Sequence, residues 1–384
     1  MSLSKAELER YSRHLIIPEF NIAGQQKLKK ASVLVIGSGG LGSPLLLYLA
    51  AAGVGRIGLV DFDRVDETNL QRQVIFGVDD VGQPKVEAAA ARLRQLNPHI
   101  EVEVHDTRFT VENARELIRA YDVVADGTDN FQTRYLVNDA AVLEGKPNVY
   151  ASIFRFEGQC TVFNQALSDG TRGPNYRDLF PTPPPPGLVP SCAEGGVIGV
   201  LPGILGSLQA LEVIKVITGV GETLSGRLFL FDAATFTTRT VKVRKSPKNP
   251  LTGDEPTQTE LVNYEAFCNA GAALQATETP VREITPQELE AWRFEGRTHL
   301  LVDVREPYEF GIAEMGGELI PLHSVEESQH RIPKDRPVVL HCRSGVRSAR
   351  AVRALEALGY TNLYSLEGGI LAWQEQIQPE LARY

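Results

Sequence analysis

Residues 33–61 read VLVIGSGGLGSPLLLYLAAAGVGRIGLVD and decide the fold. The apolar run at 33–36 is bounded by glycine and predicts a buried strand, and the apolar stretch that ends near Gly53 predicts a helix. Between them, the glycines of residues 37–42 permit a tight turn and a close approach of the backbone to a ligand. The next strand ends in Asp61, where a ribose hydroxyl would lie. The stretch therefore predicts a βαβ nucleotide site with a phosphate at the helix N-terminus.

Length and composition narrow the class of protein. The chain has 384 residues, which is too long for one compact core and predicts roughly two to three domains. The net charge of −9 argues against nucleic acid or an anionic membrane as a partner. Four cysteines without a C-x-x-C pair do not form a disulfide scaffold. The N-terminus lacks the apolar core of a signal peptide, so we expect a cytoplasmic protein.

The longest apolar stretch, residues 197–220, is expected to be a buried helix. It contains Pro202, Gln209, Glu212 and Lys215. Because polar and charged side chains are costly inside a bilayer, these residues argue against a membrane span.

The order of the expected elements predicts the architecture. Strands and helices alternate up to residue 148, which is typical of a doubly wound, mostly parallel α/β sheet. The later strands are expected to be antiparallel additions to this sheet. Residues 249–279 are rich in Pro, Asn, Thr, Gln and Ala with little periodicity, and we interpret them as a linker. The predicted domains are therefore 1–248 and a small α/β domain at 280–384.

Five polar residues bear on which nucleotide binds. A glycine loop alone is most common in NAD-dependent dehydrogenases. Arg72 and Lys85, however, follow the second strand, where a triphosphate would meet them, and NAD has no triphosphate. Asp129 follows a further strand and is suited to hold Mg²⁺ against phosphate oxygens, while Asp61 and Asp63 reach the same crevice. Each residue alone is explained by a surface, paired or capping role, but together they favour ATP.

Several motifs occur in the order found in one known family. They are Gly37-x-Gly-Gly-x-Gly42, Asp61-Phe-Asp63, Asn69-Leu-Gln-Arg72-Gln73, Gly82-Gln-Pro-Lys85 and Asp126-Gly-Thr-Asp129-Asn130. By these motifs the chain resembles the E1-like adenylyltransferases of the MoeB/ThiF group, which activate ubiquitin-like sulfur carriers. Together with a C-terminal loop described below, the resemblance extends to MoeZ-type adenylyltransferase/sulfurtransferases and covers nearly the whole chain.

The resemblance implies a role for each motif. Asp61 would hold the ribose, Asp129 would hold Mg²⁺, and Arg13 would reach the ATP site of a second subunit, which implies a homodimer. It places ATP contacts at Gly37, Gly39, Gly40, Gly42, Asp61, Asp63, Asn69, Arg72, Lys85, Asp129, Asn130 and Arg13. The substrate would be a carrier of the MoaD/ThiS/CysO kind that ends in Gly-Gly. Its carboxylate would attack the α-phosphorus of ATP and displace pyrophosphate, helped by positioning and by the charges of Arg72, Lys85 and Asp129.

Residues 342–348 read CRSGVRS and resemble the active loop of a rhodanese. Cys342 follows an expected strand and precedes an expected helix, so backbone N–H groups are directed at its sulfur, and Arg343 and Arg347 add positive charge. Both effects favour the thiolate or persulfide, and so polar a loop argues against a buried apolar cysteine. The expected persulfide loop is Cys342, Arg343, Ser344, Gly345, Val346 and Arg347. A cysteine desulfurase or thiosulfate would load the sulfur, which would attack the acyl adenylate and leave a thiocarboxylate.

The other cysteines are less informative. Cys192 matches a family cysteine after a Pro-rich crossover loop, where it would form a thioester or a disulfide-linked intermediate; the alternative is a small loop residue. Cys160 and Cys268 are assigned to packing.

The chain departs from the family where many members bind structural zinc through two C-x-x-C pairs. The corresponding residues are Asn175 and Asp178, then Asn249 and Thr252. Because tetrahedral structural zinc generally needs Cys or His, we expect no structural zinc.

Two other functions fit parts of the sequence. One is an NAD-dependent oxidoreductase with a regulatory rhodanese-like module. The other is a non-catalytic sensor, against which Asp129 and Cys342 argue. The pathway served by a carrier could be that of molybdopterin, and so of molybdenum cofactor biosynthesis, or that of thiamine, cysteine or a thionucleoside.

Overall fold

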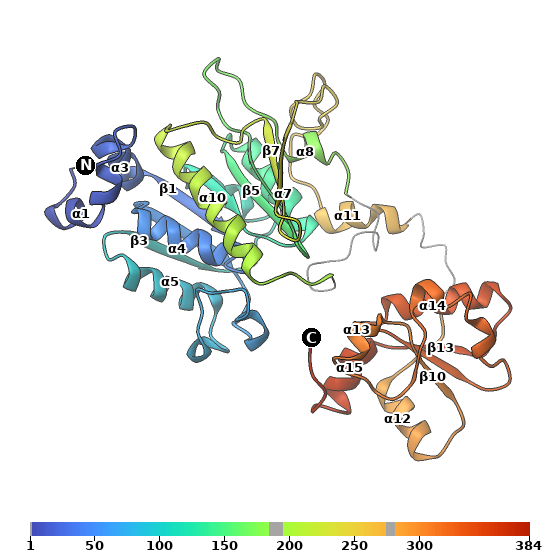
Figure 1. Cartoon of the computed structure of the whole chain (residues 1–384). Helices are drawn as coiled ribbons and strands as arrows, with labels where there is room; N and C mark the ends of the chain where they lie inside the picture. Colours follow the sequence, from blue (N-terminus) through green and yellow to red (C-terminus); the bar gives the residue numbers. More distant parts are fainter. Residues whose placement is uncertain (1, 184–194, 274–280) are drawn as a thin grey trace. The chain divides into compact units, whose positions relative to one another are not determined.

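The computed structural model describes residues 2–183, 195–273 and 281–384 (Figure 1). The chain divides into two compact units, Met1–Gln275 and Ala276–Tyr384. Each unit has its own sheet and its own buried core.

The described part of the first unit contains one eight-stranded sheet in the order β3-β2-β1-β4-β5-β6-β7-β8. Its strands are β1 Ser32–Ile36, β2 Arg56–Asp61, β3 Glu101–Asp106, β4 Val123–Asp126, β5 Asn148–Phe154, β6 Glu157–Phe163, β7 Arg227–Asp232 and β8 Thr237–Lys242. Neighbours from β3 to β5 pair in parallel, and those from β5 to β8 pair antiparallel. This confirms the predicted doubly wound sheet with antiparallel additions.

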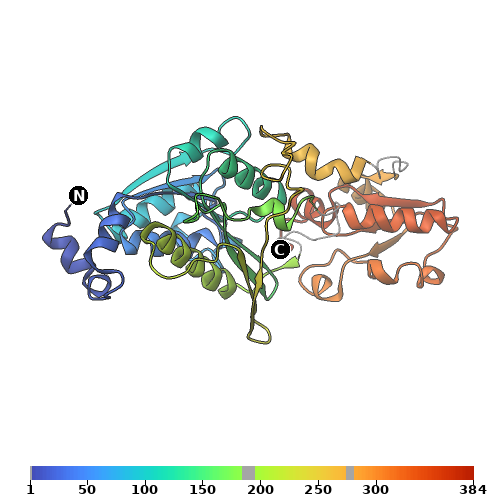
Figure 2. The same ribbon diagram turned by 90° about the horizontal axis from the view of Figure 1, so that it is seen from above.

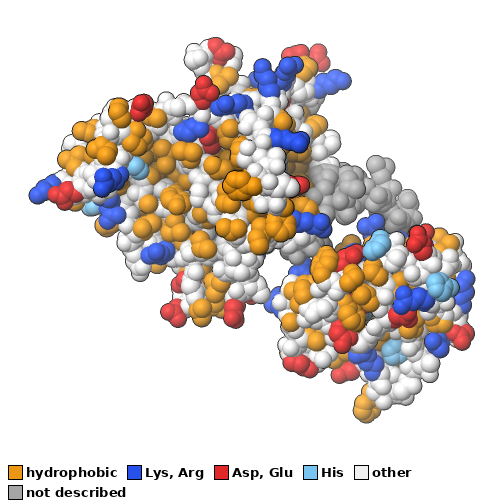
Figure 3. All heavy atoms as spheres, viewed as in Figure 1, with side chains coloured by type: hydrophobic (Ala, Val, Ile, Leu, Met, Phe, Trp, Pro, Cys, Tyr) orange, Lys and Arg blue, Asp and Glu red, His pale blue; other side chains and the backbone are white. Residues whose placement is uncertain are grey.

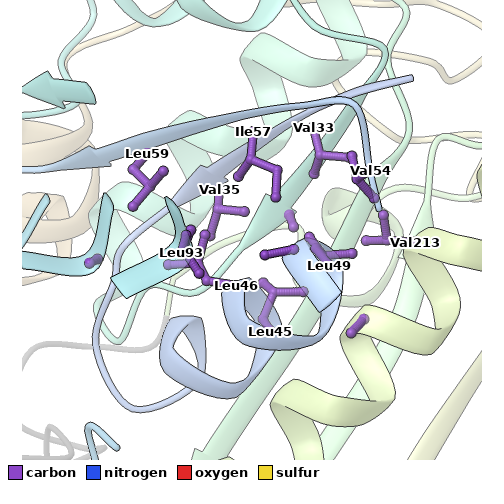
Figure 4. Close-up of a cluster of buried hydrophobic side chains, with 14 of the residues drawn as sticks. Val33, Val35, Leu45, Leu46, Leu49, Val54, Ile57, Leu59, Leu93 and Val213 are labelled. Atoms are coloured by element: carbon purple, nitrogen blue, oxygen red, sulfur yellow. The ribbon is translucent and has the colours of Figure 1, made fainter. Parts of the chain in front are cut away.

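Helices cover both faces of this sheet (Figures 1 and 2). They are α1 Lys5–Arg10, α2 Ser12–Leu15, α3 Asn21–Lys30, α4 Gly42–Ala52, α5 Lys85–Leu96, α6 Ala114–Arg119, α7 Phe131–Leu143, α8 Tyr176–Leu179, α10 Val200–Thr218 and α11 Tyr264–Ala273, with 3₁₀ turns η1 Glu67–Asn69 and η2 Val78–Asp80. Val33 and Val35 of β1 pack with side chains of α4, α5 and α10, as Figure 4 shows. Leu34 and Ile36 point the other way and pack with α6, α7 and α11. The alternation places α4, α5 and α10 on one face of the sheet and α6, α7 and α11 on the other.

Helix α10 is the one described helix that is long and apolar enough, by length and composition, to cross a membrane. In this fold it packs on β4, β5 and β6 and against α4. It buries Gln209 and Glu212, and the amide of Gln209 donates to the main-chain carbonyls of Asp126 at 2.8 Å and Val149 at 3.1 Å. The polar residues in the stretch therefore mark a core helix, as predicted.

The first unit extends well past residue 248. Tyr264 and Cys268 are 4% and 9% exposed and belong to the same hydrophobic cluster as α7, and the unit ends at Gln275. The predicted linker, 249–279, is therefore too long, because most of it folds onto the first unit. Gln258 and Tyr264 also hold it by hydrogen bonds to the buried Asp139 at 2.9 and 2.7 Å.

The second unit contains a five-stranded parallel sheet, in the order β11-β10-β12-β13-β9 across its described residues. The strands are β9 Glu283–Ile284, β10 Leu300–Asp303, β11 Glu318–Leu319, β12 Val338–His341 and β13 Leu363–Leu366. The helices are α12 Pro286–Phe294, α13 Pro307–Phe310, α14 Val346–Ala357 and α15 Gly369–Gln376, with 3₁₀ turns η3 Leu322–Ser324 and η4 Gln329–Arg331. As its sequence indicates, α12 starts at a capping box in which Thr285 Oγ1 accepts from Glu288 N–H at 3.2 Å.

Candidate functional site

A cavity of about 650 Å³ lies at the carboxyl ends of the parallel strands of the first unit. It is lined by the glycine loop after β1, residues 61–63 at the end of β2, residues 107–112 after β3, and residues 127–130 and 132–134 after β4. The strand order reverses between β1 and β4, so the loops that follow these two strands diverge and leave a crevice, which is where open α/β sheets bind ligands.

The glycine loop is shaped by backbone contacts and held by one carboxylate. Gly37 has a φ of +90°, and a Cβ at Gly42 would lie 2.1 Å from the carbonyl oxygen of Gly37. Larger residues at these positions would break the turn. The N–H and Oγ–H of Ser38 each donate to Asp61 Oδ2 at 2.8 Å. Asp61, the expected ribose ligand, is therefore oriented by the loop itself, through a serine that the sequence did not single out.

Arg72 and Lys85 both line the cavity. Lys85 is the first residue of α5 and is only 6% exposed, and its Nζ lies 3.0 Å from Oδ2 of Asp63. Arg72 lies beside the glycine loop, since a Cβ at Gly40 would be 3.6 Å from its Cγ, and its Nη1 donates to the carbonyl of Thr68 at 3.1 Å. Arg72 and Lys85 therefore line the same cavity as the glycine loop, and Arg108 and Arg134 line it too. Several cations in one cavity suit a polyphosphate.

The turn after β4 presents Asp129 and Asn130 to the cavity. The N–H and Oγ1–H of Thr128 donate to Oδ1 of the buried Asp126 at 2.9 and 2.7 Å, and burial raises the pKa of Asp126. Asn130 caps α7, because its Oδ1 accepts from the N–H of Thr133 at 2.9 Å. Asp129 is exposed. One exposed carboxylate beside bound phosphates is the kind of ligand that Mg²⁺ takes.

Other expected contacts lie elsewhere. Asn69 is outside the described lining, and its Oδ1 accepts from the N–H of Asp66 at 3.3 Å at the start of η1. Arg13 is exposed on α2 and does not line the cavity of its own chain. Gly42 acts through its contact with Gly37 rather than as lining. Cys192 lies outside the described residues.

Several parts of the lining were missed from sequence, among them residues 107–112 after β3. Gln73 is 5% exposed, lines the cavity, and has an Oε1 without a hydrogen-bond partner among the described residues. Its place in the motif with Arg72 was the available signal. Residues 261–265 also line the cavity, but they lie in the segment interpreted as a linker, where no pattern marked them.

In the second unit, Cys342 follows β12 with a side chain only 1% exposed. The polar sequence had argued against burial. The loop combines both features, because the sulfur is enclosed but meets hydrogen-bond donors: Gly345 N–H donates to Sγ at 3.1 Å and Ser348 Oγ–H at 3.7 Å. Gly345 has a φ of +98°, which only glycine adopts readily. Two hydrogen-bond donors therefore point at the enclosed sulfur.

Both arginines of this loop donate hydrogen bonds to residues distant in the sequence. Arg347 donates to the two carboxylate oxygens of Glu309 at 2.6 and 2.7 Å, and Arg343 donates twice to the main-chain oxygen of Tyr384 at 2.9 and 2.6 Å. The phenol of Tyr384 contacts Arg305 and, at 3.5 Å, Glu309. Although burial raises the pKa of Glu309, its hydrogen bonds with Arg347 and the Glu306 backbone outweigh burial, and the net shift is downward. Tyr384 thus contacts Arg343 of the loop through its main-chain oxygen, and Arg305 and Glu309 through its phenol.

The four residues at the zinc-ligand positions lie together. Asn175 Nδ2 donates to Thr252 Oγ1 at 3.0 Å, and Asn249 Nδ2 donates to Asn175 Oδ1 at 3.2 Å. Asp178 Oδ1 accepts from the N–H of Ser246 at 2.8 Å. In this chain, hydrogen bonds between amide and hydroxyl groups join the segments around residues 175 and 249. In family members with zinc, two cysteine pairs would join the same segments through the metal.

The fold and these two sites define a class of protein. A model of the ThiF family matches residues 11–252, and a model of the rhodanese-like domain matches residues 285–376. The chain belongs to the ThiF family and carries a C-terminal rhodanese-like domain. It is an enzyme of the adenylyltransferase and sulfurtransferase class.

Three relatives have names that agree with this class of enzyme. The chain is 52% identical over 386 residues to the probable adenylyltransferase/sulfurtransferase MoeZ of Mycobacterium tuberculosis, covering 100% of this chain and 97% of that one. It is 56% identical over 268 residues to the sulfur carrier protein adenylyltransferase of Thermus thermophilus (70% of this chain, 99% of the relative). It is 44% identical over 402 residues to the adenylyltransferase and sulfurtransferase MOCS3 of Anopheles gambiae (100% and 90%).

A solved structure supports the fold alone. Escherichia coli MccB with MccA-N7isoASN matches with a TM-score of 0.57 at 23% identity, over 65% of this chain and 75% of that one.

Proposed function

We propose that this enzyme uses ATP to adenylate the C-terminal carboxylate of a ubiquitin-like sulfur carrier, and then transfers sulfur to it from a persulfide on Cys342. The observation that carries the first half is the cavity in which Arg72, Lys85 and Asp129 meet the glycine loop. The name of the Thermus thermophilus relative supports a sulfur carrier as the substrate. The membership of the ThiF family leaves the alternative, an NAD-dependent oxidoreductase, without support.

In the adenylation step the carboxylate oxygen of the carrier bonds to the α-phosphorus of ATP. The bond from that phosphorus to the bridging oxygen of the β-phosphate breaks, and pyrophosphate leaves. Lys85 and Arg72 neutralise charge on the phosphates, and Asp61 orients the ribose. Asp129 would hold Mg²⁺, which when bound neutralises further phosphate charge. Because these groups act by position and charge, the step needs no general base.

In the sulfur-transfer step the terminal sulfur of the Cys342 persulfide attacks the carbonyl carbon of the acyl adenylate, and AMP leaves. The product is an acyl disulfide on Cys342. A second thiolate then attacks the Cys342 sulfur, the S–S bond breaks, and the thiocarboxylate leaves. Cys192 is our candidate for this thiolate, and a cellular thiol would reduce the resulting disulfide. A cysteine desulfurase or thiosulfate would reload Cys342.

We further propose that the enzyme is a homodimer. Figure 3 shows apolar side chains spread over the face that carries α4 and α10. On these helices Tyr48, Val200 and Leu211 are 57%, 65% and 49% exposed, and exposed apolar side chains grouped in this way are typical of protein interfaces. Arg13 is exposed and absent from its own cavity lining, as expected of a residue that serves a second subunit.

The two activities separate in one variant. Cys342→Ala should keep carrier-dependent ATP–pyrophosphate exchange within about twofold of wild type, because Cys342 takes no part in adenylation, and should abolish thiocarboxylate formation, detected by mass spectrometry of the carrier. Cys268→Ala is the matched control and should retain both. Thiocarboxylate formed by Cys342→Ala would show that the sulfur comes directly from another donor. Thermal stabilisation by NAD(H) and not by ATP·Mg²⁺ would overturn the adenylation half.

A further inference from the structure

Two arginines near the persulfide loop are fixed by carboxylates of the second unit. Arg305 is fully buried and donates through Nε to both carboxylate oxygens of Asp303 at 2.9 Å. Arg347 pairs with both oxygens of Glu309, whose side chain is 6% exposed. Breaking either pair would leave a buried carboxylate without its partner, which is costly. Neither arginine is therefore free to change partners.

Arg343, which follows Cys342 in the loop, is held in a different way. Its Nε and Nη2 both donate to the main-chain oxygen of Tyr384, at 2.9 and 2.6 Å, and its guanidinium lies 5.6 Å from the centroid of the Tyr384 ring. Among the residues that the structure describes, Tyr384 is the one acceptor of hydrogen bonds from this side chain. Because the acceptor is a main-chain oxygen, another oxygen can replace it without leaving a buried charge unpaired.

Tyr384 belongs to residues 378–384, which we call the strap. The strap is attached to α15 at Leu381, whose carbonyl accepts from Gln374 Nε2 at 3.2 Å. The side chain of Leu381 is also partly buried in a hydrophobic cluster to which α15 contributes. Residues 382 and 383 are exposed, and the strap then meets the loop through Tyr384. The part of the strap beyond Leu381 can therefore leave the loop while the rest stays attached.

We propose that Arg343 is the docking residue for the C-terminal tail of the sulfur carrier, and that the strap occupies this place until the tail displaces it. This deepens the proposed function and rests on it. Cys342 is 1% exposed, yet the acyl carbon has to come within about 3–3.5 Å of the reacting sulfur, so a covering segment must move. A Gly-Gly tail has no side chains, so an enzyme recognises it by its main-chain oxygens. A main-chain oxygen is the group that Arg343 binds in the strap.

Two alkylating probes separate docking from access. Iodoacetamide measures the access of a small electrophile to Cys342, and the chloromethyl ketone of acetyl-Gly-Gly imitates the tail of the carrier. Peptide mass spectrometry assigns the label, and the ratio of the two rates cancels any change in the reactivity of the sulfur. In full-length protein, Arg343→Ala should lower the ratio of the chloromethyl ketone rate to the iodoacetamide rate about tenfold, because the hydrogen bonds to the tail are lost. Arg350→Ala, at an exposed arginine of α14, is the matched control and should leave the ratio unchanged.

A chain that ends at Leu381 tests the strap. Both rates should rise about tenfold because both probes then meet an open loop, and their ratio should stay within about twofold of wild type. Arg343→Ala in this shortened chain should again lower the ratio about tenfold, which would not happen if Arg343 served only to hold the strap.

Each result bears on one proposal. An unchanged ratio in Arg343→Ala, or unchanged rates in the chain that ends at Leu381, would overturn the docking role and leave the proposed function standing. Thiocarboxylate formed by Cys342→Ala would instead remove the sulfur-transfer step and, with it, this docking site.

Discussion

The ammonium of Lys85 lies 3.0 Å from the carboxylate of Asp63, and the two side chains are 7% and 50% exposed. The lysine is thus nearly enclosed at the start of α5 while its partner is open to solvent. This asymmetry means that the ion pair holds the ammonium at the cavity without burying the carboxylate, so an incoming phosphate can share the cation.

Lys85→Ala should therefore separate catalysis from stability. We expect carrier-dependent ATP–pyrophosphate exchange to fall about 100-fold or more, because a preorganised charge aimed at the reacting phosphates is lost. The unfolding free energy should change by only about 1 kcal/mol, since Asp63 is left solvated rather than buried and unpaired. Lys245→Ala, at an exposed lysine, is the control. If Lys85→Ala carries out ATP–pyrophosphate exchange at the wild-type rate, Lys85 has no role in the adenylation step.

Tyr384 should limit access to Cys342. The phenol contacts Arg305 and Glu309, and the main-chain oxygen accepts from Arg343. Tyr384→Ala should raise the rate at which iodoacetamide alkylates Cys342 roughly tenfold, since the lost phenol contacts are worth about 1–2 kcal/mol. Peptide mass spectrometry assigns the label. Tyr308→Ala, at a tyrosine 62% exposed, should leave the rate unchanged. Equal rates in all three proteins would show that Tyr384 does not cover the sulfur.

The second unit should lose stability as the pH falls. Burial lowers the pKa of His341 from 6.5 to about 4. Between these two pH values, His341 is therefore protonated in the unfolded chain and neutral in the folded chain. Unfolding therefore becomes easier between pH 6.5 and about 4, by on the order of 3 kcal/mol. Both tryptophans, Trp292 and Trp373, belong to this unit, and their fluorescence in urea reports its unfolding in the whole chain.

The matched variants isolate this residue. His341→Gln should flatten the pH dependence over that range, and His330→Gln, at an exposed histidine, should not. If wild type and His341→Gln lose stability in parallel, other groups account for the effect.

The boundary of the first unit has a direct test. A chain ending at Lys248 lacks Gln258 and Tyr264, so Asp139 loses two of its donors. Each hydrogen bond to a charged group contributes about 1.5–3 kcal/mol, so this chain should unfold at a much lower temperature. A chain ending at Gln275 should keep the unfolding temperature and ATP affinity of the first unit. If the chains ending at Lys248 and at Gln275 unfold at the same temperature, the predicted linker of residues 249–279 is supported.

Much of the fold followed from local patterns. The strand, glycine turn, helix and strand of residues 33–61 appear in the structure within one or two residues of the prediction. Alternation of buried side chains and the needs of the turn are properties of neighbouring residues, so a sequence displays them. The cationic residues Arg72 and Lys85 were also predicted from the sequence, because both come soon after the strand that ends at Asp61.

What the sequence did not display depends on residues far apart in the chain. Nothing local marks Tyr264 as a partner of Asp139, because their contact exists only once α7 and α11 are packed together. Cys342 is buried although its neighbours are polar, since Glu309 and Tyr384, distant in sequence, take up the charges of its loop. By itself, then, the sequence determined the glycine turn and the order of strands and helices, and it predicted the candidate reactive groups. Only the tertiary structure decided what encloses them, because burial and pairing of charged side chains are set by the whole packed chain.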